Sequence, residues 1–354
     1  MPLTLLMLTE CMQNNMFEKL KDKGNFRICY LGGSITEGAG ASDKTRRWST
    51  QITAHLNSLG IENTVFEEIN VGIGGTDSVY GMARLSRDVL TFAPDAVFID
   101  FSLNDADLDD KTSTDSYEGI IRKLASIPSA PYVICIGVVP NREQEFKTEL
   151  HKKIAAHYGL TYIDVKAAID KEFGKAEPGV NTARDMLFRP DNVHPVEAGY
   201  DFYTKVIKSE LSEESFKRPC DVEPINPTFQ TKSLVFTDAL TFAQKGNWRS
   251  SCGVSWSSPN PGRKGVFAAS DDTDAELSFE FSGDVLLLGC RLDRLAGKLE
   301  SELDGVKRVH DLCYATDDQP VIILSENSLG KGKHKLLLRP ICGEVKIDFA
   351  AVSE

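Results

Sequence analysis

Between residues 26 and 208, short apolar runs alternate with longer segments whose apolar residues recur at helical spacing. The runs that predict strands are RICYL, TVFEEIN, DAVFIDF, YVICIGVV and LTYIDV. The segments that predict helices are 48–59, 79–92, 117–127, 143–158 and 195–207. Because strand and helix alternate five times, we expect a doubly wound α/β domain, a parallel five-stranded sheet with helices on both faces.

Beyond residue 232 the pattern changes to short strands in which apolar and polar residues often alternate. AELSFEFSG, DVLLLGCRL, GKLESELDG, PVIILSE, KHKLLLR and EVKIDFAAV are examples, and Gly, Asp and Asn turns separate them. This pattern predicts an all-β sandwich over residues 233–354. Residues 209–232 contain several prolines and no periodicity, which predicts a linker. Within residues 1–25, an apolar pattern over 3–20 predicts an amphipathic N-terminal helix docked on the α/β domain.

Composition excludes several kinds of partner. The 354 residues include 40 Lys and Arg against 52 Asp and Glu, a formal net charge of -12, with no evident basic patch, so we expect no nucleic acid partner. No segment approaches the ~18 uninterrupted apolar residues of a membrane span, and the N-terminal residues lack the features of a signal peptide. We therefore expect a cytoplasmic protein that has no membrane partner. Its oligomeric state is not predicted.

The eight cysteines are scattered and form no CxxC pair. Isolated cysteines of this kind fit a reducing compartment better than a disulfide framework. Their spacing also predicts no zinc site.

Four polar blocks lie where predicted strands end or where the last predicted helix begins. They are GGSIT at 32–36, NVGIGGTDS at 70–78, SLND at 102–105 and DNVH at 191–194. Taken singly, each has a plainer interpretation as a glycine-rich turn, a tight βα turn, a helix cap or a polar loop. Because ligands of parallel sheets bind outside the carboxyl ends of the strands, the four blocks together favour one catalytic site.

The residues in these blocks suit acyl transfer. The hydroxyl of Ser34 is a weak nucleophile unless a base takes its proton, and His194 is the candidate base. Asp191 is the candidate carboxylate that orients the imidazole, although a backbone carbonyl could do so instead. The amides of Ser34 and Gly75 and the side-chain NH₂ of Asn104 are candidate donors to the oxyanion of a tetrahedral intermediate. Glycine suits position 75 because a side chain there would crowd the oxyanion.

Ser34, Gly75, Asn104 and His194, in that order, resemble the set found in the SGNH (GDSL-like) hydrolases. The resemblance covers about residues 26–208 and leaves the C-terminal part unassigned. It implies a flavodoxin-like three-layer fold with Ser34 as nucleophile, Asp191 and His194 completing the triad, and Gly75 and Asn104 in the oxyanion hole. It implies no metal and no organic cofactor.

Two positions depart from the usual pattern of this family. The acidic residue that commonly precedes the serine is Gly33, and the glycine that commonly opens the Gly-x-Asn-Asp block is Ser102. The GGSIT form resembles a subgroup that is often associated with polysaccharide or sugar-ester substrates. The blocks are also followed by small and charged residues, GAGASDKTRR and DADLDDKTSTD, rather than by a long apolar stretch.

The sequence therefore predicts a serine esterase that hydrolyses short acyl esters, first of all acetyl esters, of a carbohydrate-like small molecule or oligosaccharide. A lysophospholipase, a thioesterase or an acyltransferase could use the same triad. A carbohydrate-binding protein that has lost catalysis is the alternative that is not an enzyme.

Other conspicuous residues are placed outside the site. Trp48, at helical spacing, is expected in the core and Arg84 on a solvated face. Trp248 and Trp256 could stack on sugars, but filling the sandwich core or the domain interface is favoured. Two acidic residues of the polar blocks are expected only to make loop hydrogen bonds: Asp77 and Asp105.

Overall fold

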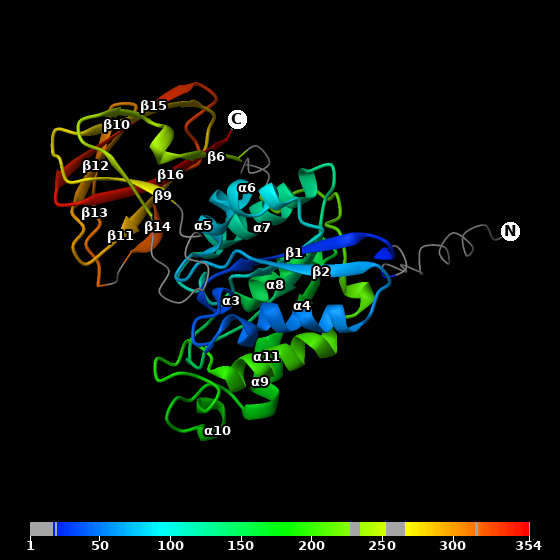
Figure 1. The fold of residues 1–354 in the computed structure, drawn as a ribbon. Coiled ribbons are helices and arrows are strands. Elements are labelled where there is room, and N and C mark those ends of the chain that lie inside the picture. The colour runs from blue at the N-terminus through cyan, green and yellow to red at the C-terminus, as the bar shows by residue number, and fades with distance from the viewer. Residues whose placement is uncertain (1–16, 18–19, 227–233, 253–265, 316–317, 354) are drawn as a thin grey trace.

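The computed structural model describes residues 17, 20–226, 234–252, 266–315 and 318–353. Figure 1 shows two domains side by side, an α/β domain from the first half of the chain and a β domain from the last third. The helix predicted over residues 3–20 lies almost wholly outside the described residues.

The α/β domain is built on a parallel sheet in the strand order β2-β1-β3-β4-β5. Its strands are β1 (Gly24–Gly32), β2 (Thr64–Asn70), β3 (Ala96–Asp100), β4 (Tyr132–Ile136) and β5 (Thr161–Ile163). This order is that of the flavodoxin-like fold, so the predicted fold class is confirmed. The order reverses between β1 and β3, and the crevice outside their carboxyl ends is the usual binding place of such sheets.

Helices cover both faces of this sheet. One face carries α4 (Trp48–Ser58), α9 (Val165–Phe173) and α11 (Glu197–Glu210), whose apolar residues join one core cluster. The other face carries α5 (Ser78–Ala83), α7 (Asp110–Ser126) and α8 (Thr148–His157) in a second cluster. Trp48 is fully buried in the first cluster, as expected. The result is a three-layer domain with a core on each side of the sheet.

Some helices differ from the prediction. The segment 79–92 is not one helix but α5, α6 (Leu85–Asp88) and the 3₁₀ turn η2 (Leu90–Phe92). The first break falls at Arg84, whose side chain turns inward to the sheet. Helix α9 was not predicted, although Asp164 accepts a hydrogen bond from Ala167 N at its start as an N-cap should.

The segment after α11 packs along the α/β domain. Phe216 is fully buried, and Lys217 bridges to Val133 at the edge of β4. Farther on, the carboxylate of Glu118 in α7 accepts hydrogen bonds from Ile225 N at 2.6 Å and Asn226 N at 3.0 Å. The connection to the second domain is thus held to the first over most of its described length.

The β domain consists of two antiparallel sheets packed face to face, which confirms the predicted all-β domain. One sheet contains β13 (Val306–Asp311), β12 (Lys298–Leu303), β15 (Lys333–Cys342), β10 (Glu276–Ser282) and β7 (Ala243–Lys245). The other contains β14 (Gln319–Glu326), β11 (Leu286–Leu292), β16 (Val345–Ser353), β9 (Val266–Ser270) and β8 (Arg249–Cys252), and β6 (Leu234–Asp238) pairs with β16. Alternate residues of both sheets fill the space between them.

Trp248 packs against this sandwich core, as favoured from the sequence, and Trp256 lies outside the described residues. Strand β13 was not predicted. Its two valines, Val306 and Val309, are exposed on an edge strand, so the strand shows no buried apolar face.

The two domains share a hydrophobic cluster. Leu287, Phe349 and Ala351 of the β domain lie in the same buried cluster as the residues of α5. The ring centroid of Phe349 is 5.3 Å from that of Tyr80, with the edge-to-face geometry that aromatic pairs prefer. Figure 1 shows the β domain beside α5 and α6.

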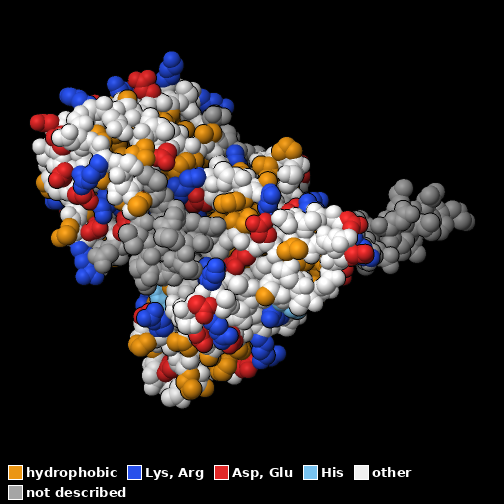
Figure 2. Space-filling view, viewed as in Figure 1, with side chains coloured by type: hydrophobic (Ala, Val, Ile, Leu, Met, Phe, Trp, Pro, Cys, Tyr) orange, Lys and Arg blue, Asp and Glu red, His pale blue; other side chains and the backbone are white. Residues whose placement is uncertain are grey.

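Charged side chains of both signs are interspersed over both domains on the face drawn in Figure 2. The excess of acidic residues is therefore not gathered into a single patch on that face. Among the described helices, none is both long enough and apolar enough to cross a membrane.

Candidate active site

Ser34 lies where β1 turns into the short helix α3 (Ser34–Glu37). The two glycines before it both lie in close contact with neighbouring segments. A Cβ on Gly32 would lie 2.6 Å from the carbonyl oxygen of Asp100, and a Cβ on Gly33 would lie 2.2 Å from Asn104 Oδ1. The carboxamide of Asn104 therefore lies against the peptide that precedes Ser34. A side chain at position 33 would have to displace the carboxamide of Asn104 from the place it has here.

His194 and Asp191 meet Ser34 from the loop before α11. Ser34 Oγ lies 3.0 Å from His194 Nε2, and His194 Nδ1 lies 2.9 Å from Asp191 Oδ2. The other carboxylate oxygen accepts from the amides of Val193 at 2.8 Å and His194 at 2.9 Å. Burial would raise the pKa of Asp191, but these hydrogen bonds outweigh burial and hold its pKa below the ordinary value. The carboxylate is thus kept ionised beside the imidazole.

Residues that follow β4 donate hydrogen bonds to this loop. Asn141 N donates to Asn192 O at 3.0 Å, and Arg142 Nη2 donates to Asp191 O at 3.3 Å. Asn192 has a φ of 56°, in the left-handed region where asparagine is tolerated better than most residues. The backbone that presents Asp191 and His194 is therefore fixed by partners from another loop.

The turn at Gly74 and Gly75 lies next to Ser34. A Cβ on Gly74 would be 3.4 Å from Ser34 Cβ, and Gly74 N donates to Glu37 Oε2 at 2.7 Å. Gly75 has a φ of 72°, which disfavours any residue with a side chain. A side chain at 75 would also meet Gln319 of the β domain, which is a contact that the sequence did not predict.

The structure thus joins Ser34, His194 and Asp191 in one row of hydrogen bonds, and it places Asn104 and Gly75 in the segments beside Ser34. No group of three or more His, Cys, Asp or Glu that could hold a metal ion occurs in the described parts of the chain.

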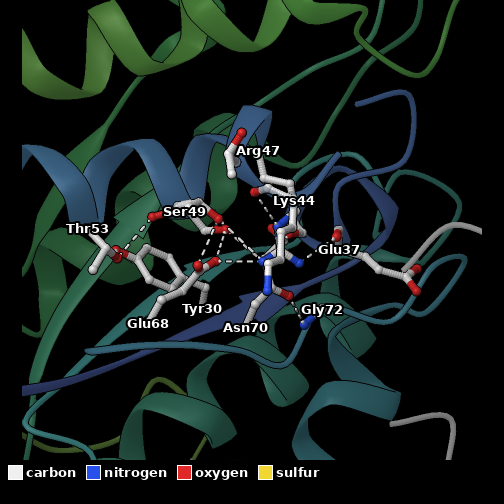
Figure 3. Close-up of polar contacts among 12 residues, drawn as sticks. Tyr30, Glu37, Lys44, Arg47, Ser49, Thr53, Glu68, Asn70 and Gly72 are labelled. Atoms are coloured by element: carbon white, nitrogen blue, oxygen red, sulfur yellow. Dashed lines mark hydrogen bonds and ion pairs between the residues drawn. The ribbon is translucent and has the colours of Figure 1, made fainter. Parts of the chain in front are cut away.

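A largely buried polar network supports the short helix α3, which begins at Ser34, from the α4 side (Figure 3). Glu68 of β2 accepts hydrogen bonds from Arg47 Nη2 at 3.1 Å, Ser49 Oγ at 2.7 Å and Thr50 Oγ1 at 2.7 Å. Arg47 Nη1 also donates to Glu37 O at 3.4 Å. The carboxylate of Glu68 therefore pairs with a largely buried guanidinium that reaches the end of α3.

Asn70 connects the same network to the loop that follows β2. Its Nδ2 donates to Thr36 O at 2.6 Å and to Ser49 Oγ at 2.9 Å, while its Oδ1 accepts from Gly72 N at 3.0 Å. Figure 3 shows this side chain with its hydrogen bonds to Ser49 and Gly72. Helix α3 and the loop leading to Gly75 are thus tied by one side chain.

Arg84 corrects the sequence interpretation. The side chain is fully buried, so the expectation of a solvated face is wrong. Arg84 Nη1 donates to Val71 O at 2.7 Å and pairs with Asp88 at 3.0 Å, and Nη2 donates to Gly32 O at 3.4 Å. The guanidinium links the ends of β1 and β2 from within. An acidic residue four positions later was the available signal, because a buried arginine needs an anionic partner.

Asp77 and Asp105 make loop hydrogen bonds, as expected. Asp77 accepts from Tyr80 N at 2.9 Å and caps α5, and burial raises its pKa to about 6. Asp105 accepts from Ser78 N at 2.8 Å and lies 3.0 Å from His151 Nε2. The residue after Asn104 is therefore bonded to the start of α5, which follows the turn at Gly75.

Comparison with known proteins assigns the α/β domain to a family. Residues 30–202 match the model of the GDSL-like lipase/acylhydrolase family. The α/β domain belongs to this family. The protein is accordingly a carboxylic ester hydrolase, and its β domain lies outside the matched residues. No curated protein matches the chain.

Solved structures similar to this chain include a two-domain esterase active on acetylated mannans, co-crystallised with mannopentaose. It is 22% identical, with a TM-score of 0.74 over 99% of this chain and 96% of that chain. A lipase/acylhydrolase from Enterococcus faecalis is 24% identical, covers 55% of this chain and 98% of its own, and has a TM-score of 0.43. The first likeness shows the same fold over both domains.

Proposed function

We propose that the protein is a serine esterase that removes acetyl groups from the hydroxyls of an oligosaccharide. The observation that carries the proposal is the row of contacts from Ser34 Oγ to His194 Nε2 at 3.0 Å and from His194 Nδ1 to Asp191 Oδ2 at 2.9 Å. A neutral imidazole that donates its Nδ1 proton to Asp191 has Nε2 available to accept the proton of Ser34.

In this mechanism Ser34 Oγ attacks the acetyl carbonyl carbon while its proton passes to His194 Nε2. The tetrahedral intermediate collapses, the sugar oxygen leaves with the proton from His194, and the acetyl group stays on Ser34. Water then attacks the acetyl-enzyme with His194 again acting as base, and acetate is released. Asp191 remains ionised and stabilises the imidazolium that forms in each step.

Negative charge on the carbonyl oxygen would be met by the amides of Ser34 and Gly75 and by the side-chain NH₂ of Asn104. The contact between Asn104 and Gly33 and the closeness of Gly74 to Ser34 support this assignment. Donors that are fixed before the reaction stabilise the developing oxyanion without reorganising.

The acetylated carbohydrate is proposed on two grounds. The GGSIT form of the turn at Ser34 resembles a subgroup that is often associated with polysaccharide or sugar-ester substrates, and its second glycine leaves space that the Asn104 carboxamide fills here. The structure that shares the fold of both domains is that of an esterase active on acetylated mannans. We therefore take acetylated mannan oligosaccharides as the first substrates to test.

The test compares initial rates on p-nitrophenyl acetate, butyrate and octanoate, together with acetate release from acetylated mannan oligosaccharides. The expected result is the highest kcat/KM on acetyl esters and release of acetate from the oligosaccharides. A clear preference for octanoate would contradict the acetyl assignment in favour of a lysophospholipase or thioesterase. Transfer of acetyl to an added sugar in place of water would indicate an acyltransferase. Failure of a serine-directed phosphonate to label Ser34 would favour a carbohydrate-binding protein.

A further inference from the structure

One side chain of the β domain reaches the candidate oxyanion turn. Gln319 is the first residue of β14, and its Nε2 donates to Gly74 O at 3.3 Å. A Cβ built on Gly75 would lie 2.2 Å from Gln319 Nε2 and 2.3 Å from Oε1. The carboxamide therefore lies directly over the α-carbon of Gly75, and a side chain at position 75 would displace it.

The carbonyl of Gly74 and the amide of Gly75 belong to the same peptide unit. Because this unit is planar and its C=O and N–H point in opposite directions, a donor that fixes the carbonyl also fixes the direction of the Gly75 N–H. A hydrogen bond to the carbonyl also polarises the peptide and makes its N–H a better donor. Gln319 thus acts on the amide that would bind the oxyanion.

A turn of two glycines needs such support because its backbone has more accessible conformations than any other dipeptide. Glu37 fixes one side of the turn, since its carboxylate accepts from Gly74 N at 2.7 Å. That contact comes from the helix that carries Ser34. Gln319 holds the next peptide, and it comes from the other domain.

We propose that Gln319 is a positioning residue of the esterase site, through which the β domain aligns the Gly75 amide for the oxyanion. The inference rests on the proposed function, because it assigns a part of the same site. Gln319 need not touch the substrate to act in this way.

The start of β14 is itself tied to the α/β domain. Arg291, which pairs with Pro320 across β11 and β14, is fully buried and donates from Nε to Asp348 at 2.8 Å. Asp348 in turn accepts from the phenol of Tyr80 in α5 at 2.9 Å. Arg291 Nη1 also lies 3.3 Å from Asp318, the residue before Gln319. This chain of contacts sets the position of Gln319 relative to the turn.

The test substitutes Gln319→Met and Gln319→Glu in the full chain. Methionine keeps a side chain of similar length over Gly75 but cannot donate to Gly74 O, and glutamate adds a negative charge beside the oxyanion. Gln319→Met also removes the hydrogen bond from Nε2 to Pro320 O, which lies within the β domain. Loss of the hydrogen bond to Gly74 O predicts a fall in kcat of about 3- to 10-fold on p-nitrophenyl acetate for this variant, with KM within about twofold. Gln319→Glu should show a larger fall.

Gln244→Met and Gln244→Glu are the matched controls. Gln244 is an exposed glutamine of the same domain, and its Nε2 donates to Leu240 O at 3.3 Å. Both control variants should keep the kcat and KM of the wild type. If Gln319 had only a structural role, its variants would have a changed melting temperature but the same kcat as the wild type.

A trifluoromethyl ketone that forms a tetrahedral adduct with serine gives a second readout. Its inhibition constant should rise by the same factor by which kcat/KM falls, because the adduct carries the oxyanion. Full kcat and unchanged inhibition in both Gln319 variants, with an active wild type and an inactive Ser34→Ala, would overturn the inference alone. A change confined to KM would also overturn it. A wild type that hydrolyses no acetyl ester would overturn the proposed function and, with it, the role of Gln319.

Discussion

The two domains use buried polar side chains in different ways. In the α/β domain, buried polar residues gather around the carboxyl ends of the strands, where Glu37, Asn70 and Arg84 bond to the backbone near Ser34. The core between the sheets of the β domain is mainly apolar instead, although Ser301 and His334 are buried on the strands that line it. Its buried ion pair, Arg291 with Asp348, lies where the β domain meets α5.

The difference shows where each domain needs atoms in fixed places. A buried polar group costs free energy unless it is hydrogen-bonded, so a fold that keeps many of them gives up stability for fixed geometry. In the α/β domain the fixed geometry surrounds Ser34. In the β domain it surrounds the start of β14, from which Gln319 reaches the turn at Gly74. The β domain therefore contacts the candidate site through the polar residues near the start of β14. Its mainly apolar sandwich core lies away from the site.

The largest expected effect is the loss of activity when Ser34 or His194 is replaced, and its absence would contradict the comparison of the two domains. Ser34→Ala and His194→Ala should each lower kcat on p-nitrophenyl acetate by about 10⁴-fold or more, because nucleophile and base act as a unit. Steady-state kinetics measures the loss, and circular dichroism checks that the fold is kept. The double variant should be no less active than either single one.

Ser58→Ala and His55→Ala, both on α4, serve as controls and should retain the activity of the wild type. Activity that survives in Ser34→Ala would mean that the polar network of the α/β domain does not surround the nucleophile. In that event the comparison between the domains would lose its functional meaning.

The next effect concerns Asp191 and compares an exposed polar residue of the α/β domain with the buried ones. The side chain of Asp191 is 41% exposed, unlike the buried residues around Ser34. Asp191→Asn should therefore lower kcat by less than the ~10⁴-fold that follows the same change at a buried triad aspartate. A loss as large as that of His194→Ala would show that the exposed carboxylate is as important as a buried one.

The same variant has a pH signature in stability. The pKa of Asp191 is lower in the folded protein than in the unfolded chain, so its contribution to stability is present above the unfolded pKa of about 3.9. The contribution is lost as pH falls through the folded pKa. Urea unfolding should find Asp191→Asn less stable than the wild type at pH 7, with the difference shrinking below about pH 4. A difference that grows on acidification would contradict this.

The parallel sheet and the grouping of the polar blocks at its edge could be predicted from the sequence, because both depend on local pattern. The strand runs gave the parallel sheet, and the blocks around Ser34, Asn104 and His194 lie at strand ends whose relative position follows from the fold class. Each of those predictions needed only the residues of one segment and the rule for where parallel strands meet.

Other features depend on pairs that are far apart in the sequence. Gln319 meets Gly74 across 245 positions, and neither residue has a pattern that predicts the other. Arg84 was wrongly predicted on a solvated face for the same reason. Helical spacing does not reveal that the carbonyls of Gly32 and Val71 accept hydrogen bonds from its side chain. Helix 79–92 was predicted as continuous because its apolar spacing persists through the inward turn of Arg84.

The smallest expected effect concerns Tyr80, the phenol through which α5 meets the buried Asp348. Burial, together with the neighbouring carboxylate, holds the pKa of Tyr80 well above its usual range, so the phenol stays protonated and remains the donor. Tyr80→Phe should lower the free energy of unfolding by about 1 kcal/mol, since Asp348 keeps its two contacts with Arg291. Tyr203→Phe, which removes a hydrogen bond to Val139 O inside the α/β domain, is the matched control for stability.

Catalysis separates these two tyrosines. If Tyr80 matters to the site by setting where β14 begins, Tyr80→Phe should lower kcat by less than Gln319→Met does, and Tyr203→Phe should not lower it. The effect of Tyr80→Phe should also disappear in the Gln319→Met background, because the side chain it helps to place no longer donates to Gly74. A double-mutant cycle on kcat measures this coupling. Additive losses would mean that Tyr80 influences the α/β site by a route other than Gln319. The β domain would then influence the site through more contacts than that of Gln319 with Gly74.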